Sequence, residues 1–177
     1  MIGPDAVARC QWLEPGGEQA AQVICAFLQE VGISLSIEPI AAKMFVPGMD
    51  IWQGGLRIDP AVPAYPGDLL HEAGHIAVIE RPRRDSICDV GTDPAEEMTA
   101  IAWSIAAARA CGVPLEVVFH PAGYRGGSEA LIAVFEQHQP AFDTYLDQIN
   151  ARAPRAIRTN AALEACITAK EIKLYEL

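Results

Sequence analysis

The chain has 177 residues, of which 51% are hydrophobic and 20% charged, and its formal net charge is −10. This length and composition are typical of one folded domain and exclude a disordered chain, and the negative charge argues against non-specific binding of nucleic acid. We therefore predict a single domain over residues 1–177, with a core in about 18–125 and a helical C-terminal part in about 128–177.

The N-terminal residues 1–5 contain no basic segment followed by an apolar stretch, so we expect no secretory signal. The five cysteines are widely spaced and include no C-x-x-C pair, which argues against both a disulfide framework and a thiolate metal site. The longest apolar run, Met98–Ala108, is too short to cross a bilayer. These features favour a reducing cytoplasm and no membrane association.

The first part of the chain carries three readable patterns. They predict an amphipathic helix over residues 18–31, a half-buried strand over 33–37 and a hairpin of two short strands over 51–59. Gly32 is expected to end the helix, and Gly54-Gly55 is expected to form the hairpin turn. The prolines that follow the hairpin predict a loop that leads into the next helix.

Residues 71–75 form an H-E-x-x-H motif, and the flanking residues predict the helix that this motif requires, with Asp68 as its N-cap. His71 and His75 would lie one turn apart on the same face, where two imidazoles can bind one zinc ion at about 2.0–2.1 Å each. Glu72 projects about 100° around the helix from His71, so it would accept a proton from a metal-bound water. The alternative is that both histidines are satisfied within an ordinary core.

A third metal ligand is expected from the next predicted helix. Asp93 is its expected N-cap, Pro94 its first residue and Glu96 its third, a position from which a glutamate often bonds back to the N-cap amide. That structural role leaves Glu97, which shares a face with apolar residues and would need a partner such as a metal ion. We prefer Glu97 as the ligand and keep Glu96 and Asp93 as alternatives.

The loop at residues 120–127 combines possible hydrogen-bond donors with glycines that allow close approach to a substrate. His120, Tyr124 and Arg125 are the donors that this loop offers for an oxyanion, and Tyr124 is slightly preferred. The alternative is that His120 caps or packs and that the glycines only turn the chain.

Beyond this loop the chain is predicted to be helical. Segments beginning at Ser128, at Pro140 and near Asn160 each carry an apolar stripe at helical spacing. These stripes fit either the core of the domain or the interface of a homodimer.

The region over about residues 50–110 resembles the zincin metallopeptidases, in particular small bacterial-type, gluzincin-like members. Twenty-one residues (76–96) separate His75 from Glu97, which is similar to the spacing in zincins whose third ligand is a glutamate from a second helix. Residues 97–100 also resemble the E-x-x-A opening of that helix in several small peptidases, including those that cleave repressors of mobile elements. The departure is Ile101, where those families commonly carry Asp or Asn to support a ligand.

The order of elements and this resemblance together predict an α+β fold, helix-rich, with a small twisted antiparallel or mixed sheet over the H-E-x-x-H helix. By resemblance, the segment Leu56–Ile58 would be the edge strand that holds an extended peptide. The implied function is that of a zinc metallopeptidase that acts on a peptide or protein. A zinc-bound water, activated by Glu72, would attack the peptide carbonyl while His71, His75 and Glu97 hold the Zn²⁺ ion.

Two other hypotheses remain open at this stage. A metal-binding but non-catalytic domain with a regulatory or structural role would bind the ion and show no hydrolysis. A purely structural helical protein would bind no stoichiometric metal.

Overall fold

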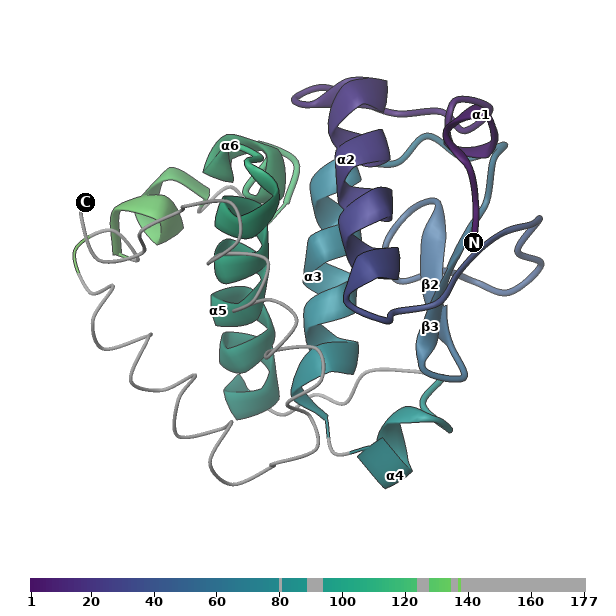
Figure 1. Cartoon of the computed structure of the whole chain (residues 1–177). Helices are drawn as coiled ribbons and strands as arrows, with labels where there is room; N and C mark the ends of the chain where they lie inside the picture. Colours follow the sequence, from purple (N-terminus) through teal and green to yellow (C-terminus); the bar gives the residue numbers. More distant parts are fainter. Residues whose placement is uncertain (80, 89–93, 124–127, 135–136, 138–177) are drawn as a thin grey trace.

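The computed structural model describes residues 1–79, 81–88, 94–123, 128–134 and 137. Its architecture is α+β, helix-rich, with a small three-stranded mixed sheet, as expected (Figure 1). In chain order, the elements are α1 (Pro4–Val7), α2 (Gly17–Glu30), β1 (Leu35–Ile37), β2 (Met49–Trp52), β3 (Gly55–Ile58), α3 (Pro66–Val78), α4 (Arg81–Arg84), α5 (Pro94–Cys111) and α6 (Leu115–Val118).

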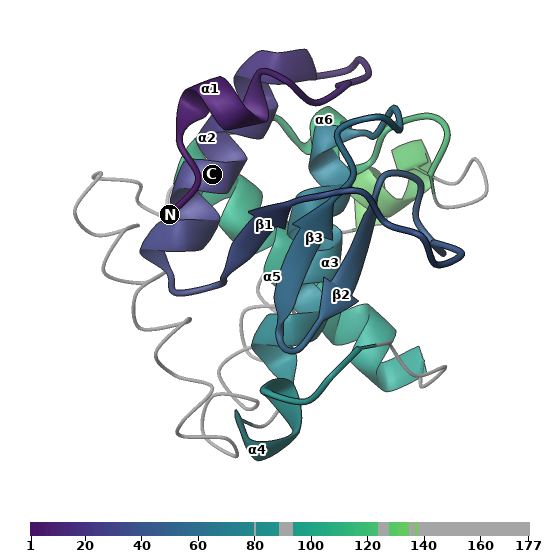
Figure 2. The ribbon, with the colours of Figure 1, turned by 90° about the vertical axis from the view of Figure 1, so that its right-hand side faces the viewer.

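The helix α3 lies between the sheet on one side and α5 on the other, with α2 running beside it (Figures 1 and 2). The sheet turns apolar side chains toward this helical layer, and the four that alternate along β2 and β3 are all buried: Met49, Ile51, Leu56 and Ile58. This alternation follows from the two-residue period of a strand with one covered face. The H-E-x-x-H motif is therefore on the central helix of the fold.

The strand order is β1-β3-β2, with β1 parallel and β2 antiparallel to β3. The predicted hairpin is confirmed, but its turn lies at Gln53-Gly54, one residue earlier than expected, and both residues have positive φ angles of 49° and 73°. The expectation that Leu56–Ile58 is an edge strand is wrong, because β1 pairs with the free side of β3 and makes it the central strand. On the edge of β2 that faces away from β3, the Met49 amide donates a hydrogen bond to the Val46 carbonyl at 3.4 Å in an isolated antiparallel bridge.

The predicted helix over 18–31 is confirmed within a residue as α2, and its end explains why the following strand is short. Gly32 has a φ of 87° and its amide bonds to the carbonyl of Gln29, while the amide of Ile33 bonds to the carbonyl of Leu28. This pair of bonds is a Schellman-type helix end. Ile33 therefore still belongs to the helix end, and the strand begins only at Leu35.

The start of α3 differs from the prediction. The helix begins at Pro66, whose fixed φ suits the first helical position, and Tyr65 is the N-cap without a side-chain hydrogen bond. Asp68 is thus the third helical residue rather than the N-cap. Its carboxylate is used instead by a residue far along the chain, His120.

The segment after α3 contains the short helix α4, and one of its arginines contacts the end of α3. The Arg84 guanidinium donates hydrogen bonds to the carbonyls of Ala77 at 2.8 Å and Ile79 at 3.0 Å. These carbonyls lie at the C-terminal end of α3, where backbone acceptors lack intrahelical partners. Arg84 therefore caps the end of the central helix.

The second predicted helix is confirmed as α5, with Pro94 as its first residue and Gly112, at a φ of 71°, directly after its end. Residues 128–134 are helical, in agreement with a helix that begins at Ser128. The predicted helices from Pro140 and Asn160 lie outside the described residues. Within the part of the chain that the structure describes, no helix is long and apolar enough to span a membrane.

Candidate metal centre

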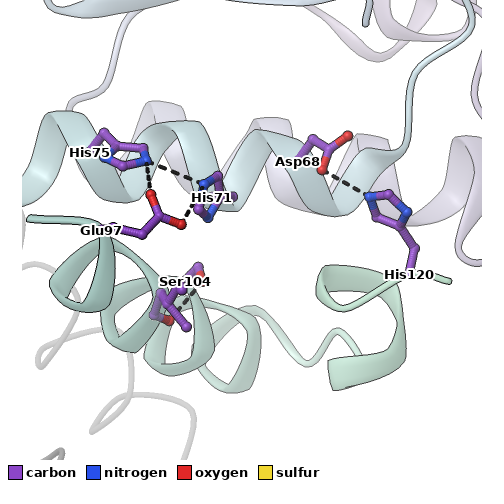
Figure 3. A network of polar contacts seen from close by, with 7 residues as sticks. Asp68, His71, His75, Glu97, Ser104 and His120 are labelled. Carbon is purple, nitrogen blue, oxygen red and sulfur yellow. Dashed lines mark hydrogen bonds and ion pairs between the residues drawn. The ribbon is translucent and has the colours of Figure 1, made fainter. Parts of the chain in front are cut away.

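Two histidines on α3 and one glutamate on α5 point toward one another between the two helices (Figure 3). The Nε2 atoms of His71 and His75 are 3.2 Å apart, and their rings meet edge to face. The two carboxylate oxygens of Glu97 lie 3.6 Å from His71 Nε2 and 3.3 Å from His75 Nε2. The helical spacing of four residues thus produces the shared face that the sequence predicted.

The approach of α5 that brings Glu97 to the histidines depends on Gly74, inside the motif. A Cβ atom added at Gly74 would lie only 2.5 Å from the carbonyl oxygen of Ala100 on α5. Ala100 is one turn along α5 from Glu97, so the contact fixes the height and separation of the carboxylate. Without a side chain at this position, the two helix backbones can pack closely enough for the three ligand atoms to meet.

These separations are compatible with a metal site. Two ligands, each about 2.0–2.1 Å from an ion and at a tetrahedral angle, are about 3.3–3.4 Å apart. The Nε2 atoms of the two histidines, 3.2 Å apart, are close to that value. Glu97 approaches each histidine with a different carboxylate oxygen, at 3.6 and 3.3 Å, and with one atom taken from each residue the three lie within 4.8 Å of one another. Two imidazoles and one carboxylate are also a donor set that zinc accepts, and three protein ligands leave one position for a reacting molecule. The residues present are therefore compatible with a bound metal ion.

The choice between the neighbouring glutamates follows from their partners. Glu96 forms an ion pair with Arg83, with its Oε1 2.7 Å from Nη1, so its carboxylate is engaged away from the histidines. Glu97 is the one that contacts His71 and His75. Asp93, the other alternative, lies outside the described residues.

The surroundings shift the pKa values of His71, Glu72 and Glu97 for different reasons. Burial lowers the pKa of His71, and the neighbouring His75 lowers it further. A hydrogen bond with His75 holds the pKa of Glu97 below its ordinary value, although this carboxylate is 46% exposed. Burial raises the pKa of Glu72 to about 7, since this carboxyl group is only 6% exposed. The His71 imidazole thus favours the neutral form that binds metal, and Glu72 is a carboxyl group held out of water.

Glu72 also lines a groove of about 430 Å³ that runs along β2. The other lining residues come from the loop before β2, from the hairpin and from the segment after α4: residues 42–46, residues 49–52, Arg57 and Cys88. Because the two-residue turn closes on the pair of Trp52 and Gly55, the N–H and C=O groups of Ile51 point away from β3. A backbone edge that can pair with an extended chain therefore borders the groove that Glu72 lines.

His120 occupies a different place from the one its predicted role requires. Its Nε2 lies 2.9 Å from Asp68 Oδ1, near the start of α3 and away from the triad (Figure 3). The ring stacks on Tyr65 at 3.7 Å between centroids and is 3% exposed. The structure does not bring His120 to the metal ligands, and its position is that of the packing alternative. Tyr124 and Arg125, the other donors proposed for this loop, lie outside the described residues.

Sequence reasoning missed the groove wall formed by Asp50, Trp52 and Arg57. Asp50 and Arg57 are cross-strand partners, joined by two hydrogen bonds of 2.9 and 2.6 Å. A hairpin centred on Gln53-Gly54 pairs these two positions, so correct placement of the turn would have revealed the ion pair. At Ile101, where the resembling families carry a polar residue, the side chain is buried and apolar.

Comparison of the chain with protein-family models, with curated proteins and with solved structures gave no match. The resemblance to zincins therefore rests on the sequence motifs alone.

Proposed function

We propose that this protein is a zinc-dependent hydrolase, specifically a metallopeptidase. The observation that carries the proposal is the His71, His75 and Glu97 cluster, in which one potential ligand atom from each residue lies within 4.8 Å of the others. The buried carboxyl group of Glu72 lies one residue from His71 and lines a substrate-sized groove. Glu72 therefore connects the two parts that hydrolysis requires, because it neighbours a ligand on α3 and is the residue of the motif that lines the groove.

His71, His75 and Glu97 would hold the ion, which supplies a Lewis acid for the substrate carbonyl and makes water more acidic when bound. Glu72 is the proton carrier of this proposal. One of its carboxylate oxygens accepts a proton from the attacking water and then donates it to the leaving nitrogen. Its burial keeps bulk water away from the transferred proton.

A peptide is the substrate that the surroundings support best. The outward N–H and C=O groups of Ile51 allow an extended main chain to add to β2 as a fourth strand. A chain bound there lies in the groove to which Glu72 contributes. We accordingly propose β2, instead of β3, as the strand that would pair with the peptide.

The test combines zinc content with peptide hydrolysis. Protein purified without chelator should carry about one zinc per chain, and His75→Ala should lose it because one imidazole ligand is gone. Glu72→Gln should retain zinc and lose at least about 100-fold in kcat, because the proton carrier is removed and no ligand is. Glu96→Gln is the matched control for Glu97→Gln: only the latter should release zinc, since Glu96 pairs with Arg83.

The result also separates the two functions that keep a metal. Zinc that is bound through His75 and Glu97, with no hydrolysis across a broad peptide library, would refute the peptidase and leave a non-catalytic metal-binding domain. The buried apolar side chain of Ile101, in place of a polar support for a ligand, is the observation that favours this second function. Absence of zinc even after reconstitution would refute both.

A further inference from the structure

The groove along β2 has walls of unequal character. Its volume of about 430 Å³ lies within the range of small-ligand sites, about 300–1,000 Å³. One wall is the hairpin, and the other is the loop at residues 42–46. Glu72 belongs to neither wall, so the side chains of these walls are free to select a substrate without taking part in proton transfer.

The hairpin wall is rigid and electrically neutral. The Arg57 guanidinium binds both carboxylate oxygens of Asp50, at 2.9 and 2.6 Å, and its Cζ lies 4.4 Å from the centre of the Trp52 ring. A two-point ion pair satisfies both charges and fixes the plane of the guanidinium, and stacking holds the indole against it. A charged substrate side chain would therefore find this ion pair already complete, while the indole offers an apolar surface.

Each wall exposes one aromatic side chain to solvent. Phe45 is 93% exposed and Trp52 is 46% exposed, and both line the groove. Large exposed apolar residues elsewhere in the described chain stand outside this groove: Met1, Leu13, Val23, Met98 and Val134. Single exposed apolar residues are ordinary on a protein surface, but two aromatic residues in one groove mark a binding site.

We propose that this groove is a specificity pocket for a large apolar side chain of an extended peptide, and that Phe45 and Trp52 select it. The inference rests on the proposed function for its peptide substrate. The apolar side chain gains contact with both aromatic rings and covers surface that water otherwise wets. A small or charged side chain gains neither, and a charged one would in addition lose its hydration beside a neutral ion pair.

The test is a set of peptides that differ at one position, with Phe, Leu, Ala, Glu or Lys, and zinc-loaded protein. We expect kcat/KM for the Phe or Leu peptide to exceed that for the Ala peptide by about ten-fold or more. Phe45→Ala and Trp52→Ala should each remove most of that preference, measured as the ratio of kcat/KM for the Phe peptide to that for the Ala peptide. Val23→Ala, an exposed apolar position on α2 outside the groove, is the matched control and should change nothing.

A second readout does not need hydrolysis. Binding of the same peptides to metal-free protein, followed by calorimetry and by tryptophan fluorescence, should rank them in the same order. Trp52→Phe should abolish most of the fluorescence change while the calorimetric affinity for the Phe peptide stays within about three-fold, because an aromatic ring is kept.

The two readouts distinguish the failure of this inference from the failure of the proposed function. Cleavage without side-chain preference, or a preference for the Glu peptide that is lost in Lys43→Ala, overturns the specificity pocket and leaves the peptidase. Ranked binding without cleavage supports the pocket and refutes the peptidase. Neither binding nor cleavage refutes both.

Discussion

Substitution of Gly74 by Ala tests whether the close contact of α3 and α5 builds the metal centre. The new Cβ would lie 2.5 Å from the carbonyl oxygen of Ala100 and 3.1 Å from its carbonyl carbon and Cα. These are backbone atoms, so no rotamer change relieves the contact. An ordinary separation of about 3.4 Å requires α5 to move away by about 0.9 Å.

The expected loss of stability is small. Overpacking of this size costs about 1–3 kcal/mol, and replacement of a helical glycine by alanine returns about 1 kcal/mol through higher helix propensity. The net loss in the free energy of unfolding is therefore about 0–2 kcal/mol. The metal centre is more sensitive, because Glu97 moves with α5 while both histidines stay on α3. A shift of about 0.9 Å exceeds the tolerance of zinc–ligand distances, so we expect a loss of zinc affinity of at least ten-fold.

Competition with a chelator of known affinity measures zinc binding, and thermal denaturation of the metal-free protein measures stability. Gly3→Ala is the control, since a Cβ there meets no atom within 4 Å. The reasoning is refuted if Gly74→Ala binds zinc as tightly as the wild type. It is also refuted if the loss of zinc affinity, expressed as a free energy, is no larger than the loss in the free energy of unfolding.

Three further predictions concern the scaffold. Asp59→Asn should lower the free energy of unfolding at pH 7, because the amides of Ile40 and Ala61 donate hydrogen bonds to the Asp59 carboxylate and lower its pKa below the ordinary 3.8. The stability that this carboxylate contributes is present above pH 3.8 and is lost as the pH falls through the pKa of the folded state. Denaturant unfolding should accordingly show the two proteins converging in acid, and a constant difference would contradict this. Gln53→Gly should raise the free energy of unfolding by about 0.5–1 kcal/mol, because Gln53 has a φ of 49° at the hairpin turn; an unchanged or lower unfolding midpoint would argue against strain there. In native protein at pH 8, Cys88 should react with iodoacetamide while Cys25 stays unmodified by mass spectrometry, since burial raises the pKa of the Cys25 thiol to about 12 and Cys88 is exposed; equal rates would contradict this.

Local patterns in the sequence predicted the elements that local physics controls. The helical spacing over residues 18–31 and the placement of Pro94 were sufficient for α2 and for the start of α5. The preference for Glu97 over Glu96 followed from the inward face of an apolar helix. The ion pair of Glu96 with Arg83 agrees with that preference, although the sequence had suggested a capping role for Glu96.

Features set by contacts between distant segments were not predictable in the same way. Asp68 is a residue type that is common at N-caps, but its carboxylate contacts His120, 52 positions further along the chain. The central position of β3 depends on the pairing of β1 across a long connection, and no periodicity within β3 reveals how many neighbours a strand has. The groove likewise requires the loop at residues 42–46 to lie opposite the hairpin.

The helix α3 is fastened at both of its ends, by the contact of Asp68 with His120 near its start and by the Arg84 guanidinium at its last carbonyls. The chain entropy of ordering the two histidines is therefore lost during folding, before any ion arrives. Amide hydrogens of this helix should consequently belong to the most slowly exchanging group, with similar protection whether metal is bound or removed. In this respect the protein should differ from small zinc domains, in which the ion itself supplies the free energy of folding.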